Sequence, residues 1–411
     1  TTSCNIGDEH LEWYSFNNQH PVIAQNLYRL SGDGRFEQIG MSWLKHGFCA
    51  VSEPGCLGTC DPQATDCSEL GIGCADTYWA DLNASGLGPR SDINASTGVN
   101  AFSFGPSGPA AIRGRLQAHA EDIDPAQNPG ARYFAEAQYV TSDDAADGND
   151  GNNASYIEVS VFNGGNFPMT RMTATEWQKK AITAWRDNVP GVELEVVDIP
   201  SDGTFTVGHR VVDNGDGTWT YEYAIHNLNS HASARSLSLQ VPQCVEITDA
   251  GFHDVDYHSG EIYDGTDWVF QRFATSVSWS TQSFSQNPNA NALRWGTMYT
   301  FWFTANTPPV ETVATLSPFR IAANFTQPTV RTPSNACPAG CPSDVWPDNG
   351  DGTFGNGITN IDDLLAIINN FGGNDPNFDP APDNGDGTYG NGLTNIDDLL
   401  AVINGFGPCP L

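Results

Sequence analysis

The sequence predicts a mainly β protein: a disulfide-stapled, loop-rich β body of the β-sandwich type, followed by a small α-helical domain at the C-terminus. The chain has 411 residues, of which 42 are Gly and 26 are Pro, together above the usual share of about an eighth. Its 34 Asp outnumber its 15 Glu, and Asp favours turns over helix interiors. Segments of alternating apolar and polar residues recur between these turn signals, which is the pattern of short strands.

The charge balance excludes two classes of partner. Lys and Arg number 17 against 49 Asp and Glu, a formal net charge of −32. Nucleic-acid binding needs a basic face, and adhesion to anionic lipid needs basic clusters, so we expect neither partner. No apolar run approaches the roughly 18 residues of a membrane span, so we also expect no membrane insertion.

Ten cysteines, an even number, predict disulfides formed in an oxidising compartment. Five of them lie between Cys49 and Cys74, in a stretch rich in Gly, Asp and Pro. Cys56 and Cys60 have the spacing of a zinc-binding pair, but no second pair of Cys or His follows at finger spacing. Because the chain begins with Thr1 rather than Met, we expect that a signal peptide has been removed and that the protein is secreted to the extracellular space or the cell surface.

Residues 1–130 form the first predicted region, which is rich in Cys and Gly. Within it, Val22–Leu30 and Phe36–Met41 have the composition of strands. The Ser-Gly-Asp-Gly segment 31–34 between them is typical of a hairpin connection.

Residues 131–327 form the second predicted region, a β-sandwich-like domain with one helix. Segments 156–162 and 219–225 alternate cleanly, and 299–303 is a dense aromatic strand. Many short strands with a single helix are typical of a β-sandwich. The helix is predicted over 176–187, with its N-cap and apolar side formed by Thr175, Trp177, Ala181, Ala184 and Trp185.

A Pro-rich linker, 328–342, precedes a tail, 343–411, that contains 11 Asp and neither Lys nor Arg. The tail contains an internal repeat, because 348–365 recurs 35 residues later as 383–400. Each copy is an acidic loop interrupted by glycines and followed by a helical pattern. The tail is therefore predicted to be two loop–helix units.

Caps and apolar spacing define the two tail helices. Asn360 and Asn395 are predicted N-caps, and the paired aspartates that follow suit the positive end of each helix dipole. Gly372 and Gly407 are the predicted helix ends. Each helix carries one apolar stripe, made by Ile361, Leu364, Leu365, Ile368 and Phe371 and by Ile396, Leu399, Leu400, Ile403 and Phe406.

Two cysteines bracket the repeats. Cys341 precedes the first loop and Cys409 follows the second helix, so a disulfide between them would clasp the two ends of the tail. Such a bond stabilises a fold by about 2–4 kcal/mol. Cys337 competes for the same partner, and the spacing alone leaves both pairings open.

The acidic loops predict cation sites. Carboxylates gathered in one short loop repel one another without a cation, and six to eight flexibly placed oxygen ligands are what Ca²⁺ prefers. Over the tail alone, the repeats resemble the dockerin-type calcium repeat, a loop–helix relative of the EF-hand in which Gly352 and Gly387 match the turn glycine. The resemblance implies at least two calcium ions, held by Asp344, Asn349, Asp351 and Asp362 in the first copy, by Asp379, Asn384, Asp386 and Asp397 in the second, and by backbone carbonyls at Thr353 and Thr388.

Two departures from that pattern leave individual ligands open. Extra residues follow Gly352, and Trp346-Pro347 or Ala381-Pro382 separates the first ligand from the others. The alternative to calcium sites is a pair of solvated acidic turns, which leaves the duplicated carboxylate clusters unexplained. Because of the inserted residues, Asp348 and Asp383 are alternatives to Asp344 and Asp379 as first ligands.

Three further segments carry weaker signals. The hexapeptide 213–218 repeats the tail motif without a following helix and favours a hairpin turn. The acidic run 143–152 favours a mobile exposed loop over a cation site. Segment 252–261 crowds two His with several carboxylates, as a metal site or an acid–base pair would. However, His253 and His258 are five residues apart and would face opposite sides of a strand.

The sequence favours a non-enzymatic function. It contains no P-loop, dinucleotide fingerprint or His-Glu-x-x-His motif, and the segment 40–44 lacks the final glycine of a nucleophile elbow. We therefore expect a secreted structural protein that self-assembles, or attaches to partner subunits such as a scaffold, in an extracellular filament, tube or surface layer, with calcium stabilising the tail and the subunit contacts. The alternatives are a secreted polysaccharide-directed hydrolase and a carbohydrate-binding protein, each anchored through the tail.

Overall fold

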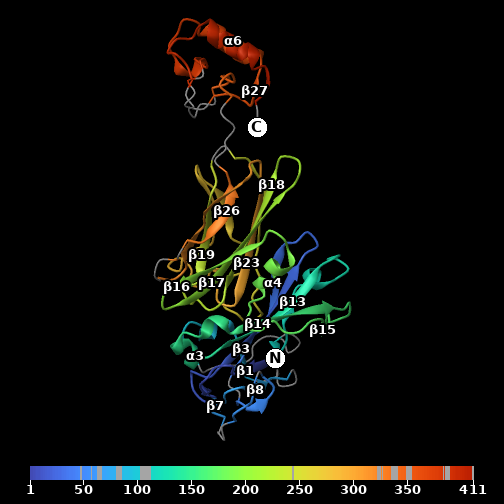
Figure 1. The fold of residues 1–411 in the computed structure, drawn as a ribbon. Helices are drawn as coiled ribbons and strands as arrows, with labels where there is room; N and C mark the ends of the chain where they lie inside the picture. Colours follow the sequence, from blue (N-terminus) through green and yellow to red (C-terminus); the bar gives the residue numbers. More distant parts are fainter. Residues whose placement is uncertain are drawn as a thin grey trace. The chain divides into compact units, whose positions relative to one another are not determined.

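The chain folds into two compact units. The body comprises Thr1–Val241 and Ile247–Thr332, and the tail unit comprises Pro242–Glu246 and Pro333–Leu411. The protein is mostly β, which confirms the predicted mainly β, disulfide-stapled body (Figure 1). No helix within the described residues is long and apolar enough to cross a membrane. The computed structural model describes residues 1–46, 49–56, 58–62, 67–79, 86–101, 113–242, 245–321, 325, 327–334, 341–348, 354–382, 384 and 389–409.

The first sheet of the body joins both of the predicted β regions. The predicted strands Val22–Leu30 and Phe36–Met41 are confirmed as β3 and β4, and β3 pairs along its whole length with β13 (Arg132–Val140). The predicted boundary near residue 130 therefore falls inside one sheet. The order of this sheet is β12 (Gln117–Ala118), β4, β3, β13, β14 (Ala154–Val161) and β15 (Met169–Arg171), with β5 (Leu44–Lys45) on β3 and β9 (Leu87–Gly88) on β5.

A five-stranded sheet forms the middle layer of the body. One of its faces packs on the first sheet, where Phe36 and Phe134 meet Met298 and Ala224, and its other face packs on a four-stranded sheet, where Trp279 stacks near Phe303. This sheet-on-sheet packing is the predicted β-sandwich. The five strands are β16 (Glu193–Ile199), β17 (Gly203–Asp213), β18 (Trp219–Asn227), β23 (Thr297–Ala305) and β20 (Ile247–His253), and the four are β21 (Val269–Arg272), β22 (Ser276–Ser280), β19 (Ala234–Gln240) and β25 (Thr315–Pro318).

Disulfides hold the short strands near the N-terminus. Three bonds, Cys4–Cys56, Cys49–Cys67 and Cys60–Cys74, use every cysteine of the predicted cluster, so Cys56 and Cys60 do not pair on a metal. None of the described cysteines is free, while Cys244 and Cys337 lie outside the described residues. The strands are β1 (Thr2–Cys4), β6 (Glu53–Pro54) and β8 (Cys74–Thr77), with the pairs β2 (Leu11–Glu12) and β7 (Glu69–Leu70), β10 (Ile93–Asn94) and β11 (Val99–Asn100), and, further along the chain, β24 (Pro309–Val313) and β26 (Thr329–Pro333).

The helix predicted over 176–187 is shorter and begins later. It is α4 (Ile182–Asn188), because the residues before it pair instead: the backbone of Glu176 bridges to Tyr156, and Gln178 adopts φ 55°. The predicted loop 143–152 contains a short helix, α3 (Ser142–Asp147), which Thr141 caps and Gly148 ends with φ 71°. The predicted hairpin turn at 213–218 is confirmed between β17 and β18. The remaining short helices of the body are η2 (Arg90–Asp92), α2 (Ala120–Ile123) and η3 (Asp150–Asn152).

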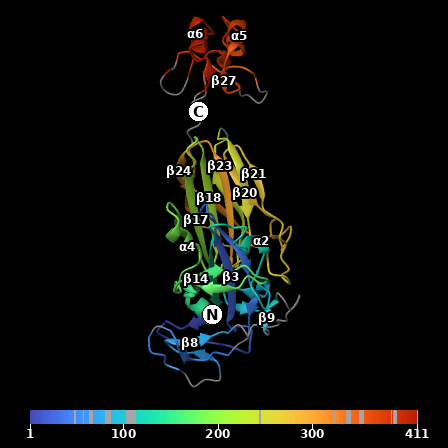
Figure 2. The ribbon, with the colours of Figure 1, turned by 90° about the vertical axis from the view of Figure 1, so that its right-hand side faces the viewer.

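In the tail unit, two helices of nine residues lie side by side (Figure 2). They are α5 (Ile361–Asn369) and α6 (Ile396–Asn404), and their C-caps, Asn370 and Gly405, each lie two residues before the predicted glycine. Their predicted N-caps, Asn360 and Asn395, are confirmed. The unit also contains η4 (Pro376–Phe378) and the pair β27 (Ile358–Thr359) and β28 (Gly407–Pro408), and its apolar core is Val345, Ala366, Ile367, Phe378 and Val402.

Candidate metal centre in the tail unit

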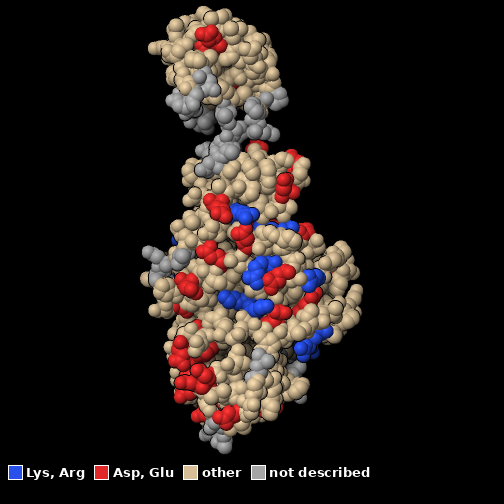
Figure 3. Space-filling model, viewed as in Figure 1, with Lys and Arg blue, Asp and Glu red and all other residues tan. Residues whose placement is uncertain are grey.

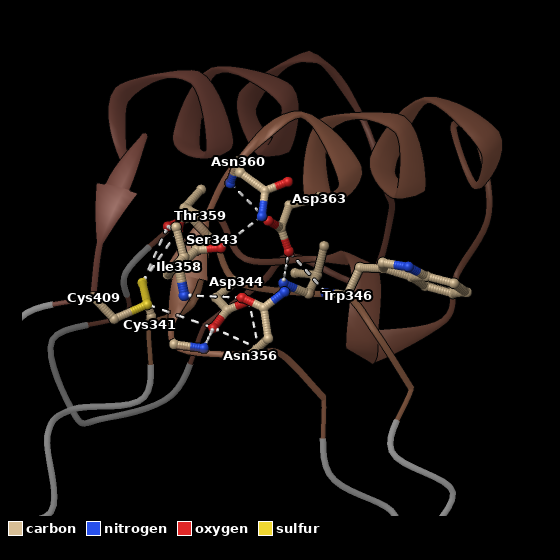
Figure 4. The surroundings of a disulfide bond; sticks show 12 residues. Cys341, Ser343, Asp344, Trp346, Asn356, Ile358, Thr359, Asn360, Asp363 and Cys409 are labelled. Atoms are coloured by element: carbon tan, nitrogen blue, oxygen red, sulfur yellow. Dashed lines mark hydrogen bonds between the residues drawn. A yellow bond between two sulfur atoms is a disulfide. The ribbon is translucent and has the colours of Figure 1, made fainter.

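In the first loop, the side chain of Asp344 points into the loop (Figure 4). It is only 9% exposed, and its carboxylate accepts backbone N–H donors from Asn356 at 3.0 Å and Gly357 at 2.6 Å. Gly355 has φ 95°, and a Cβ there would lie 2.6 Å from Cγ of Asp344. The loop therefore wraps tightly around this carboxylate, and the glycine makes the close approach possible.

The second loop repeats this arrangement. Asp379 is 6% exposed and accepts an N–H bond from Asn391 at 3.1 Å. Gly390 has φ 93°, and a Cβ on it would lie 2.6 Å from Oδ2 of Asp379. The two predicted first ligands thus occupy equivalent positions in equivalent loops.

A second carboxylate turns inward from each helix, and it is not the one that the sequence indicated. Asp363 and Asp398 are fully buried, whereas the predicted ligands Asp362 and Asp397 are exposed on the first turn. Oδ1 of Asp363 accepts N–H bonds from Val345 at 2.8 Å and Trp346 at 2.9 Å, as Figure 4 shows.

The same carboxylates complete the helix caps. Oδ2 of Asp363 accepts the N–H of Asn360 at 2.7 Å, and Oδ2 of Asp398 accepts that of Asn395 at 2.7 Å, so each helix begins with a full capping box. The signal for these residues was available in the sequence, since an Asp three positions after an Asn N-cap is the capping-box position. The resemblance to the dockerin-type repeat instead implied the neighbouring residues, Asp362 and Asp397.

In each loop–helix unit of the tail, the two inward carboxylates affect one another's pKa. Burial, together with the charge of Asp344, raises the pKa of Asp363. Burial and the charge of Asp379 likewise raise the pKa of Asp398. Two carboxylates that share a site resist ionising together, and a bound cation relieves that conflict.

The other predicted ligands are exposed or lie outside the described residues. Asp348 and Asn384 are exposed. Within the described residues, no group of three or more His, Cys, Asp or Glu side chains is arranged to hold a metal ion. The described part of each loop–helix unit therefore supplies two carboxylates toward the six to eight oxygen ligands that calcium takes. The predicted ligands outside the described residues are Asn349, Asp351, Thr353, Asp383, Asp386 and Thr388.

Most of each predicted apolar stripe does not face the tail core. Of the stripes, Leu364 and Leu399 pack against that core, and the helix residues buried in it, Ile367 and Val402, were not among those predicted. The other large apolar residues of the stripes are between 45% and 56% exposed. They form two equivalent outward rows, called here the apolar rows: Ile361, Leu365, Ile368 and Phe371, and Ile396, Leu400, Ile403 and Phe406.

The weaker candidate around His253 does not bring its two histidines together. His253 lines a cavity of about 220 Å³ with His119, Asp254 and Asp256, and its Nε2 lies 3.1 Å from the backbone oxygen of Gln38. His258 is buried elsewhere, where its ring packs on Trp43. Burial raises the pKa of Asp254 to about 6, but the described residues here form no metal-binding group.

Comparisons with known proteins identify no family for this chain. No protein-family model matches it, and no curated protein matches it. Among solved structures, one similarity is to the exo-chitosanase CsxA of Amycolatopsis orientalis, at 10% sequence identity and a TM-score of 0.18. The match covers 81% of this chain but 25% of that structure's chain, and a similarity this low carries no argument about fold or activity.

Proposed function

We propose that this is a secreted calcium-binding structural protein whose tail unit attaches the chain to other subunits of an extracellular assembly, first of all to copies of itself. The observation that carries the proposal is the pair of apolar rows on α5 and α6. Support for secretion comes from the four disulfides between described cysteines, since such bonds persist in oxidising compartments.

Calcium would bind on the loop side of the tail unit. Asp344 and Asp363 would hold one ion and Asp379 and Asp398 the other, together with oxygens from the acidic loops between them. The ion supplies positive charge where buried carboxylates otherwise oppose one another. The same carboxylates also cap the helices, so an ion bound to them would lie at the start of α5 and of α6.

Attachment to other subunits would use apolar contacts made by the apolar rows. Contiguous exposed apolar side chains mark interaction surfaces, and large apolar anchors dominate binding energy at such surfaces. The face of the tail unit seen in Figure 3 is mostly uncharged, with one group of Asp or Glu. Because α5 and α6 carry the same row, two tail units could pack face to face with α5 of each on α6 of the other, a self-complementary arrangement.

The test is the state of assembly with and without calcium. We expect negative-stain microscopy and light scattering of the full chain to show ordered assemblies in calcium that disperse in EGTA. The double variant Leu365→Asp and Leu400→Asp should stay dispersed in calcium while keeping its melting behaviour, because both side chains are 47% exposed.

The matched control is the double variant Ile262→Asp and Val269→Asp, which places the same two charges on apolar residues of the body that are 60% and 59% exposed. It should assemble as the unmodified chain does. Assembly that ignores both calcium and the charges on α5 and α6 contradicts the proposal.

A further inference from the structure

The body contains a groove that has no part in the attachment proposed for the tail unit. A cavity of about 860 Å³ opens on the first sheet, on the face turned away from the middle sheet. Its floor includes Ala135 and Ala137 of β13 and Ser155 of β14, which the strand register brings together: Ala137 pairs with Ser155 on one side and with Gln25 on the other. Paired residues project to the same face of a sheet, so small side chains leave this face hollow.

A fixed loop places an aromatic side chain at the edge of this floor. The backbone N–H of Gln178 donates to Oγ of Ser155 at 3.1 Å, and Glu176 bridges to Tyr156 of β14. Trp177, between these two attachments, lines the groove and is 40% exposed. Its indole is therefore held beside the hollow with part of its surface open to solvent.

The lining combines apolar surface with polar side chains. Side-chain amides offer a donor and an acceptor from one group, which suits neighbouring hydroxyls on a ligand. The charged side chains in the lining are Arg171 against Asp8, Asp144 and the buried Glu136, so the groove disfavours an anionic ligand. Of the amide side chains that line the groove, three already bond within the protein, namely Asn5, Asn26 and Asn153. Those that are partly or fully exposed are Gln25, Asn149, Asn152 and Gln178.

We propose that this groove binds a neutral oligosaccharide, with the indole of Trp177 against the C–H face of a sugar ring and the side-chain amides on its hydroxyls. The cavity falls in the size range of ligand sites, which combine apolar surface with a few placed polar groups. An extended peptide fits less well, because the floor is the face of a sheet whose backbone groups already pair with neighbouring strands, and peptides add to sheet edges. The inference does not depend on calcium in the tail.

Calorimetric titration of the full chain with cellohexaose, mannohexaose and chitohexaose tests the proposal. We expect at least one of these sugars to bind, equally well in calcium and in EGTA. Trp177→Ala should weaken that binding about tenfold, the order of one aromatic contact. Trp79→Ala is the matched control, because Trp79 is 66% exposed and does not line the groove, and it should bind as the unmodified chain does.

A floor variant makes the test independent of Trp177. Ala137→Leu projects a larger side chain into the hollow and should reduce sugar binding while the melting temperature stays unchanged. The proposal is overturned if none of the three sugars binds, or if Trp177→Ala binds as well as the unmodified chain. It is also overturned if an extended Val-Thr hexapeptide binds in a Trp177-dependent way and the sugars do not.

Discussion

At the scale of single residues, neighbouring aspartates at the start of each tail helix have different roles. Asp363 accepts three backbone N–H bonds and is fully buried, whereas Asp362 is exposed. In EGTA we expect Asp363→Asn to destabilise the tail unit by about 1–3 kcal/mol, since an amide cannot accept all three bonds. Asp362→Asn, the matched control, should change stability little. Equal effects of the two variants in thermal melting would contradict this assignment.

A buried histidine gives the body a dependence on pH. Burial lowers the pKa of His226 to about 3, whereas an unfolded histidine titrates near 6.5. The unfolded chain therefore binds a proton that the folded chain excludes, so this group costs stability as pH falls below about 6.5 toward 3, and the cost vanishes above that range. Among the described residues, neither ring nitrogen has a hydrogen-bond partner.

Replacing this histidine should change how the free energy of unfolding depends on pH. We expect the change in the free energy of unfolding caused by His226→Leu to be about 2 kcal/mol more favourable at pH 5 than at pH 7. This follows from roughly 1.4 kcal/mol per pH unit for one proton. Denaturant unfolding at the two pH values measures the difference. The same change in stability at both would show that His226 does not titrate as described.

At the scale of elements, the sequence predicted those whose pattern is local. β3 and β4 match the predicted bounds because alternation and the hairpin signal lie within a few residues. The helix predicted over 176–187 begins only at Ile182, because Glu176 pairs with Tyr156 of β14, a contact that periodicity cannot reveal. In the tail, the N-caps were predictable, but the buried and exposed halves of each apolar stripe depend on how α5 packs on α6. The groove over Ala135 and Ala137 also depends on strand register.

The clasp of the tail is an element-scale prediction. Cys341 bonds to Cys409, the pairing that the sequence left open, and β27 pairs with β28 beside it. Replacing both cysteines by Ser should destabilise the tail unit by about 2–4 kcal/mol. Hydrogen exchange should then rise in α5 and α6 but not in the body. Unchanged exchange in both helices would mean that the loops hold the unit without the clasp.

At the scale of the whole molecule, charge is the dominant feature. The net charge is −32, and the tail contributes 11 Asp without any Lys or Arg. In Figure 3, Asp and Glu gather over the region of α3, while Lys and Arg lie on the middle of the body. Net charge of this size keeps chains apart through mutual repulsion, so an assembly of these chains needs local neutralisation as well as apolar contact.

Calcium titration calorimetry on the full chain, stripped with EGTA and dialysed, tests the central proposal most directly. We expect saturable binding of at least two ions per chain, and weaker binding in Asp344→Asn and Asp379→Asn. Titration with sodium chloride should give no such heat. The absence of any calcium binding by the intact, folded chain would contradict it.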